Sequence, residues 1–143
     1  MKVLLVNGSP HKEGCTYTAL SEVSKALNES DIDTDMMWLG VKPISGCIAC
    51  KACVKKGQCA LGGTVNEFLS IAGDYDGFVF GTPVHWGAAS GGMTSFLDRA
   101  FYADLCGGGN RFHLKPAAAV VSARRAGTVS YTHLRAHETA ANL

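Results

Sequence analysis

Four cysteines of this 143-residue chain lie within thirteen residues, close enough for their thiolates to bind one metal centre. Cys47, Cys50 and Cys53 stand three residues apart, and Cys59 follows them. Four thiolates match the ligand count of an iron–sulfur cluster. Zinc also accepts four cysteines, but usually as two pairs with a longer spacer, so steps of three favour a cuboidal cluster. A zinc or other metal site and free or redox-active thiols are the alternatives.

The remaining two cysteines, Cys15 and Cys106, lie apart and are predicted to be ordinary buried thiols. Disulfide bonds are not expected, because Met1-Lys2-Val3 leads directly into a strand-like run rather than a secretion signal. The same start indicates a cytoplasmic protein.

A second candidate site is the segment 7–16, Asn-Gly-Ser-Pro-His-Lys-Glu-Gly-Cys-Thr, between an apolar run and a helical pattern. Backbone N–H groups at a helix start, together with hydroxyls and the positive end of the helix dipole, form a phosphate site. The segment is neither a Walker A loop nor a dinucleotide fingerprint. An ordinary strand–helix turn is the alternative. Hydroxyls or charge could come from these side chains: Ser9, His11, Lys12, Thr16 and Thr18.

A third candidate site is the segment 82–90, which follows another apolar run. An aromatic residue among small ones at a sheet edge suits a flat ring system, on which Trp86 and His85 could pack. The alternative is that Trp86 lies in the core or an interface and His85 is an exposed loop residue. The segment 122–128, with two arginines, could line the same crevice or be a solvated basic loop.

These segments need elements to position them, and apolar runs rich in branched residues predict four strands: 2–6, 35–39, 77–81 and 117–121. Apolar residues at helical spacing predict three helices: 16–27, 65–72 and 90–103. Thr64 is the expected N-cap of the second helix, with Glu67 at capping-box spacing. Asp98 and Arg99 in the third helix are expected to form a structural ion pair. The cysteines lie in an irregular stretch from Gly40 to about Gly63.

Strands that alternate with helices indicate an α/β fold with a doubly wound parallel sheet. Right-handed crossovers place every strand-to-helix loop at the carboxyl edge of the sheet, where ligands bind in such folds. The loops 7–16, 82–90 and 122–128 are therefore expected at one edge. No repeat or linker divides the chain, and its length predicts one domain.

The composition argues against several classes of partner. Charged residues make up 17% and hydrophobic residues 47% of the chain, which is enough apolar mass for one core. The net charge of +1 gives no electrostatic reason to expect nucleic acid or a membrane surface as partner. No apolar run approaches the ~18 residues of a membrane span.

Four motifs resemble a known family: GSPH at 8–11, GCT at 14–16, GTPVHWG at 81–87 and FLDR at 96–99. They are similar to the flavodoxin-like NAD(P)H-dependent FMN reductases. With the four closely spaced cysteines, the chain resembles the iron–sulfur flavoprotein branch of that family. The resemblance runs from residue 1 to about residue 128.

The resemblance implies FMN as cofactor and NAD(P)H as co-substrate. The phosphate would be held by Ser9, His11, Cys15, Thr16 and Thr18. The isoalloxazine ring would contact Thr82, Pro83, Val84, His85, Trp86 and Gly87. His11 stands where Arg or Lys is common in the family, and Cys15 where Asn or Ser is common. The resemblance also implies a 4Fe–4S cluster on Cys47, Cys50, Cys53 and Cys59, and a homo-oligomer.

The expected function is an FMN-dependent redox protein that transfers electrons from NAD(P)H or a reduced carrier to a small-molecule or protein acceptor, through the 4Fe–4S cluster. The flavin carries the chemistry, so no catalytic side chain is expected. The alternatives are a cluster-free NAD(P)H-dependent FMN or quinone reductase, a flavodoxin-like electron carrier and a zinc-binding interaction module.

The last residues, 129–143, do not fit the pattern of the fold. Their sequence, which includes Ser-Tyr-Thr-His-Leu-Arg-Ala-His-Glu-Thr, resembles translated sequencing-adapter read-through. We expect a flavodoxin-like FMN-binding domain over 1–128 that is truncated before its fifth strand, followed by a non-native tail.

Overall fold

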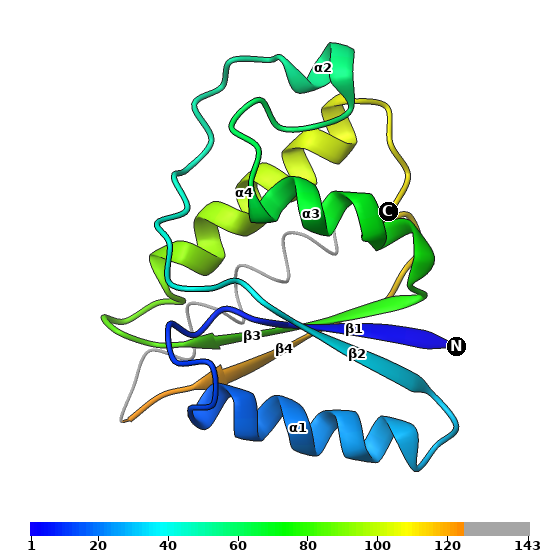
Figure 1. Ribbon diagram of the computed structural model, residues 1–143, viewed down its shortest axis with the longest axis vertical. Coiled ribbons are helices and arrows are strands. Elements are labelled where there is room, and N and C mark those ends of the chain that lie inside the picture. Colours follow the sequence, from blue (N-terminus) through cyan, green and yellow to red (C-terminus); the bar gives the residue numbers. More distant parts are fainter. Residues whose placement is uncertain (125–143) are drawn as a thin grey trace.

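The computed structural model describes residues 1–124 and shows a parallel sheet with helices on both faces (Figure 1). The sheet has four strands: β1 (Lys2–Asn7), β2 (Asp33–Trp38), β3 (Gly77–Pro83) and β4 (Ala117–Ser122). Their order is β2-β1-β3-β4, and each neighbouring pair is parallel. This is the order of flavodoxin-like folds, so the predicted α/β doubly wound architecture is confirmed. The predicted tail over 129–143 lies outside the described residues.

The helices divide between the two faces of the sheet. They are α1 (Cys15–Asn28), α2 (Cys53–Lys56), α3 (Thr64–Ile71) and α4 (Gly91–Cys106), with a 3₁₀ turn at Ala72–Asp74. Helix α1 covers one face, and α3 and α4 cover the other (Figure 1). Among the described residues, no helix is long and apolar enough to cross a membrane.

Strands β1 and β3 are buried on both faces, as their uninterrupted apolar runs predict. Alternate side chains pack toward α3 and α4: Leu4, Val6, Phe78 and Phe80. The intervening ones form a smaller cluster with Leu20 of α1: Val3, Leu5 and Val79. The site-bearing ends of β1 and β3 therefore belong to the most buried part of the sheet.

Phe68 of helix α3 is the centre of an aromatic cluster in the larger core. Its side chain is 0% exposed. Its ring centroid lies 5.7 Å from that of Phe78, 6.3 Å from Phe80, 5.0 Å from Phe96 and 5.6 Å from Phe112. One side chain thus joins α3 to strand β3, to helix α4 and to the segment before β4.

Two details of the predicted elements need correction. Thr64 is the first residue of α3 rather than its N-cap; Gly63 takes the cap position at φ 69°, where glycine is favoured, and no side chain caps the helix. Strand β3 continues through Thr82 and Pro83, which were expected in the loop. Proline is tolerated there because pairing with β1 ends at Gly81, so no strand on that side needs its missing N–H.

The stretch that carries the cysteines is also more ordered than expected. It contains the short helix α2, which starts at Cys53, ends at Lys56 and is followed by Gly57 in the left-handed conformation. A left-handed glycine is a common way to end a helix, because it has no Cβ to clash with the preceding turn. The chain is therefore locally helical between the third and fourth cysteine.

Tyr75 is expected to titrate later than an ordinary tyrosine. It is buried, and its hydroxyl donates to Oδ2 of Asp35 at 2.7 Å, the same oxygen that pairs with Nζ of Lys2 at 2.7 Å. Burial, followed by the neighbouring carboxylate, raises the pKa of Tyr75 to about 12. The unfolded value is about 10, so Tyr75 contributes stability that is complete below about pH 10 and is lost as the pH rises toward about 12.

The measurement is the tyrosinate absorbance of the folded protein against pH. We expect Tyr75→Phe to remove the step near pH 12. The same variant should lose less stability than the wild type between about pH 10 and 12. An unchanged late step in Tyr75→Phe would contradict the assignment.

Candidate functional site

The first part of the candidate site lies where β1 and β3 end. The backbone N–H of Gly8 donates to the carbonyl of Gly81 at 2.8 Å, which joins the two strand ends. Strand β2 lies on one side of β1 and β3 on the other, so the chain changes direction across the sheet at this point. Ligands of doubly wound folds bind at such a switch point. The predicted loops 7–16 and 82–90 meet at this edge; residues 125–128 of the third predicted loop lie outside the described part.

Asn7 organises the backbone of the first loop. Its side chain is 0% exposed, accepts a hydrogen bond from the N–H of Ser9 at 3.0 Å and donates to the carbonyl of Lys12 at 3.1 Å. Trp38 of β2 adds a bond from Nε1 to the carbonyl of Ser9 at 2.8 Å. Sequence reasoning included Asn7 in the segment 7–16 without giving it a role, and it did not place Trp38 in the site. The Asn-Gly-Ser pattern after a strand is a signal for such an Asx turn, whereas the Trp38 contact depends on tertiary structure.

The five predicted phosphate-binding residues fall into two groups. Ser9 and Thr16 are buried, and their hydroxyls are bonded within the protein: Oγ of Ser9 accepts from the N–H of His11 at 3.1 Å, and Oγ1 of Thr16 lies 2.8 Å from Oγ of Ser122. His11, Cys15 and Thr18 are exposed around the start of α1. The prediction that Cys15 is a buried thiol is therefore wrong: Cys15 lies on the exposed side of the first turn of α1, while Thr16 next to it is buried.

No side chain caps the start of helix α1. Gly14 is its N-cap, no side chain accepts a hydrogen bond from the first turn, and that turn contains no acidic residue. The first N–H groups of a helix have no intrahelical partner and form the positive end of its dipole. This end of α1 lies directly after the loop that Asn7 and Trp38 hold in place.

The second loop is a tight hairpin over a buried base. Thr82 is 0% exposed, and its hydroxyl accepts from the N–H of Ser90 at 3.1 Å. Ser90 in turn is the N-cap of α4, because its Oγ accepts from the N–H of Met93 at 3.3 Å. At the tip Gly87 adopts φ 66°, and Trp86 is 95% exposed. The alternative that Trp86 is a core residue is therefore wrong.

The other residues predicted to contact the ring are arranged around that tip. Pro83 and Val84 are half-buried, His85 is exposed, and Val84 forms an antiparallel bridge with Ala89. The loop thus presents an aromatic and an imidazole side chain at the surface above a hydrogen-bonded floor. Ser90, the last residue of the predicted segment 82–90, connects that floor to the first loop through a bond from its Oγ to the carbonyl of Gly8 at 3.4 Å.

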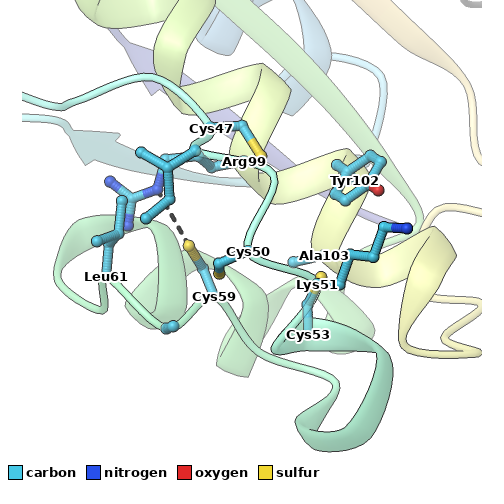
Figure 2. Close-up of a pocket in the computed structure, with 11 residues that line it drawn as sticks. Cys47, Cys50, Lys51, Cys53, Cys59, Leu61, Arg99, Tyr102 and Ala103 are labelled. Atoms are coloured by element: carbon cyan, nitrogen blue, oxygen red, sulfur yellow. Dashed lines mark hydrogen bonds between the residues drawn. The ribbon is translucent and has the colours of Figure 1, made fainter.

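The second part of the candidate site is a pocket that all four predicted cysteine ligands line (Figure 2). Cys47 and Cys50 are exposed, Cys59 is half-buried and Cys53 is buried. Helix α4 closes the pocket with Arg99, Tyr102 and Ala103. All six cysteines of the chain are free thiols. Cys106, predicted to be buried, is half-buried at the end of α4, outside the pocket lining.

The backbone between the cysteines is turned sharply. Ala49 adopts φ 52° and Lys51 adopts φ 57°, both in the left-handed region that residues with a Cβ rarely enter. Each lies between two cysteines of the evenly spaced set. Strained backbone of this kind persists only where the surroundings hold it, and it concentrates at functional sites.

Cys59 is fixed from two sides. Its backbone N–H donates to Oδ1 of Asn66 at 2.9 Å, and Nδ2 of Asn66 donates back to its carbonyl at 2.9 Å. Its Sγ accepts a bond from Nε of Arg99 at 3.2 Å (Figure 2). Asn66 of α3 had no sequence signal, because its role depends on α3 lying beside the cysteine segment.

The expected Asp98–Arg99 ion pair is wrong. Adjacent residues of a helix do not face each other, so Asp98 is exposed while Arg99 points into the pocket side of α4. Besides the bond to Cys59, Nη2 of Arg99 donates to the carbonyl of Gly62 at 2.8 Å and Nη1 to that of Ser45 at 3.5 Å. Arg99 therefore ties both ends of the cysteine segment to α4.

The phenol of Tyr102 lines the pocket, and its pKa differs from that of an ordinary tyrosine. Tyr102 has a raised pKa, first because of its hydrogen bond with Cys106 and the charge of that sulfur, then because of burial, and last because of Cys53 and Cys47. A phenol that stays protonated beside several thiols adds a hydrogen-bond donor rather than a further negative charge to this region.

The thiols are arranged around the pocket rather than at one point. Within residues 1–124 no three His, Cys, Asp or Glu side chains lie close enough to hold a single metal ion. A tetrahedral zinc ion needs four sulfurs at about 2.3 Å from one centre. A cuboidal cluster binds each thiolate at a different iron atom, so its ligands line a cavity from several sides. The donor set therefore fits a cluster better than a single ion.

A parallel sheet of this order, with an uncapped helix start at its switch point, defines a flavodoxin-like α/β protein. The four-thiol pocket beside α4 is an addition to that fold. The chain belongs to the NADPH-dependent FMN reductase family, whose model matches residues 1–142, and to its iron–sulfur flavoprotein branch. The resemblance predicted from the motifs is confirmed.

Curated relatives that are named iron–sulfur flavoproteins support this assignment. An iron–sulfur flavoprotein of Methanocaldococcus jannaschii is 34% identical over 100 residues, which are 70% of this chain and 52% of the relative. One of Clostridioides difficile is 30% identical over 103 residues, 70% of this chain and 46% of the relative. The chain thus spans about half the length of the curated relatives it matches.

Solved structures share the fold at low identity. An NAD(P)H:quinone oxidoreductase from Methanothermobacter marburgensis has a TM-score of 0.68 at 16% identity, covering 96% of this chain and 71% of that chain. RosB, with a bound 8-demethyl-8-formylriboflavin-5'-phosphate, has a TM-score of 0.69 at 13% identity, covering 94% of this chain and 57% of that chain. At these identities the likeness shows the fold alone.

Proposed function

We propose that this chain is the FMN-binding part of an oxidoreductase that transfers electrons from NAD(P)H or a reduced carrier to a small-molecule or protein acceptor, through a 4Fe–4S cluster. The observation that carries the proposal is that the four cysteines of one segment line one pocket in a fold of the FMN reductase family. The relatives named iron–sulfur flavoproteins support it. NAD(P)H as donor, a homo-oligomeric state and a cytoplasmic location stay predictions.

The FMN phosphate is proposed to lie at the start of α1. Asn7 and Trp38 fix the loop backbone, and Gly14 leaves the first N–H groups of the helix available to an anion. Of the predicted side chains, His11, Cys15 and Thr18 are exposed and can approach the phosphate directly. Ser9 and Thr16 support the loop from below through their internal hydrogen bonds.

The ring of FMN is proposed to lie against the loop that begins at Thr82. His85, Trp86 and Gly87 form the exposed tip, while Thr82 and Pro83 form its base. When bound, FMN accepts a hydride or single electrons, and the protein supplies binding and orientation. The contribution of Thr82 is to hold the tip in place through Ser90, because its own hydroxyl is buried and already bonded.

The cluster is proposed to be held by Cys47, Cys50, Cys53 and Cys59. When bound, it exchanges single electrons. The residues around it hold the ligands: Asn66 fixes the backbone of Cys59, and α2 carries Cys53. Two of the four cysteines are exposed, so iron and sulfide can reach these thiols from solvent.

The test is anaerobic reconstitution of the chain with FMN, iron and sulfide, followed by measurement of flavin and iron content and of the visible spectrum. We expect about one FMN and about four irons per chain. Cys59→Ser should lose most of the iron and keep the flavin. Cys106→Ser is the matched control, because this thiol lies near the pocket without lining it, and its iron content should equal that of the wild type.

The outcomes separate the alternatives. A chain that binds no FMN contradicts the proposal as a whole. Flavin without iron leaves a cluster-free NAD(P)H-dependent FMN or quinone reductase, and zinc in place of iron leaves an interaction module. Steady oxidation of NAD(P)H by the loaded protein excludes a flavodoxin-like carrier.

A further inference from the structure

Arg99 is a buried cation without a carboxylate partner in residues 1–124. Its side chain lies on the pocket side of α4 and is 5% exposed. The ion pairs among the described residues are Lys2–Asp35 and Arg111–Asp104, and neither includes it. Buried charges are costly unless they are paired. The partners of its guanidinium are two backbone carbonyls and one cysteine sulfur.

That sulfur is the one group among these partners that can carry a negative charge. Nε of Arg99 donates to Sγ of Cys59 at 3.2 Å, and Figure 2 shows this bond at the edge of the four-thiol pocket. A metal cluster bound by four thiolates carries net negative charge, which would supply the missing counter-charge. Lys51 also lines the pocket, but its side chain is exposed, so water screens its charge.

We propose that Arg99 is a positioning residue that holds Cys59 and raises the reduction potential of the cluster bound in this pocket. The inference rests on the proposed function, because it assigns a role toward the cluster. Its two bonds to Ser45 and Gly62 fix the direction of the guanidinium, so that Nε stays aimed at the sulfur.

The direction of the effect follows from the charge balance of reduction. One electron enters the cluster, no bond to a cysteine forms or breaks, and the negative charge on the cluster and its sulfurs grows by one. A nearby cation and an N–H donor to sulfur stabilise this more negative state more than the oxidised one. Hydrogen bonds to the sulfurs and net charge are the factors that set such potentials. Removal of Arg99 should therefore make the cluster harder to reduce.

The test compares Arg99→Gln, Arg99→Lys and Lys51→Gln with the wild type in the loaded protein. Each is titrated anaerobically with a reductant, and the cluster absorbance or electron paramagnetic resonance signal gives the reduced fraction at each potential. For Arg99→Gln we expect the ratio of reduced to oxidised cluster at a fixed potential to fall about tenfold, a shift of about 59 mV for a one-electron couple. The reduction potential of Arg99→Lys should shift less, because lysine keeps the positive charge and lacks only the planar guanidinium with its several donors.

Lys51→Gln is the matched control, since it removes the same charge from the same pocket without removing a bond to sulfur. It should change the ratio much less than Arg99→Gln. An unchanged potential in Arg99→Gln, or an equal shift in Lys51→Gln, would overturn the inference while leaving the proposed cluster intact. If Arg99→Gln does not fold or load, Arg99→Lys decides: a wild-type potential there overturns the inference. A wild-type chain without iron overturns both proposals before any variant is made.

Discussion

Replacement of Phe68 by alanine is expected to lower the free energy of unfolding by about 3–5 kcal/mol. Phe68 is fully buried and packs against rings from β3, α4 and the segment before β4. Those rings belong to different elements, so they cannot all move to fill the cavity that the substitution leaves. A domain is typically stable by about 5–15 kcal/mol, so the loss is a large share of the total.

The measurement is urea denaturation followed by circular dichroism. Phe101→Ala is the control, because this ring is only half-buried and contacts the same cluster from its edge. It should cost clearly less than Phe68→Ala. Phe68→Leu serves where the alanine variant does not fold, and it should still be less stable than the wild type. An equal cost for Phe68→Ala and Phe101→Ala would show that Phe68 is not the centre of the core.

Substitution of Gly107 by alanine is expected to damage the cysteine pocket without touching a cysteine. A Cβ at Gly107 would lie 2.6 Å from Cα of Gly57, 2.8 Å from the carbonyl oxygen of Ala103 and 3.0 Å from that of Cys53. All three atoms are backbone, so no flexible side chain can give way. The φ of Gly107 is −82°, which alanine adopts freely, so the effect is purely steric.

The clash should push α2 away from the end of α4 and displace Cys53 with it. Such overpacking typically costs about 1–3 kcal/mol. We therefore expect lower stability together with reduced iron uptake, and flavin uptake like that of the wild type, since Gly107 lies at the end of α4 opposite to Ser90. Gly73→Ala is the control, because a Cβ there meets nothing within 4 Å. Normal iron content in Gly107→Ala would contradict the role given to this contact.

Sequence reasoning was most successful where the signal is local. The uninterrupted apolar runs of β1 and β3 predict strands buried on both faces, and glycine-rich breaks after them predict loops at one edge of the sheet. The even spacing of Cys47, Cys50 and Cys53 predicts that their side chains converge on one metal centre, and in the structure all three line one pocket. Each of these features depends on residues a few positions apart in the chain.

The parts that sequence reasoning missed depend on residues far apart in the chain. Arg99 reaches Cys59, forty positions away, and Trp38 reaches Ser9, twenty-nine positions away. No sequence pattern around Arg99 or Trp38 predicts which residue it contacts. The neighbouring Asp98 suggested a wrong partner for Arg99. Opposite charges that are adjacent in a sequence suggest an ion pair, but adjacent side chains of a helix point in different directions.

Helix α4 begins at the loop proposed to contact FMN and runs toward the short helix α2 (Figure 1). Three residues in its second half, Arg99, Tyr102 and Ala103, line the cysteine pocket. From its cap at Ser90 to Arg99, the helix rises about 14 Å at 1.5 Å per residue. This length is set by backbone geometry and does not change when the exposed loops move. The helix therefore sets a fixed length between the loop proposed to contact FMN and the residues of α4 that line the cysteine pocket.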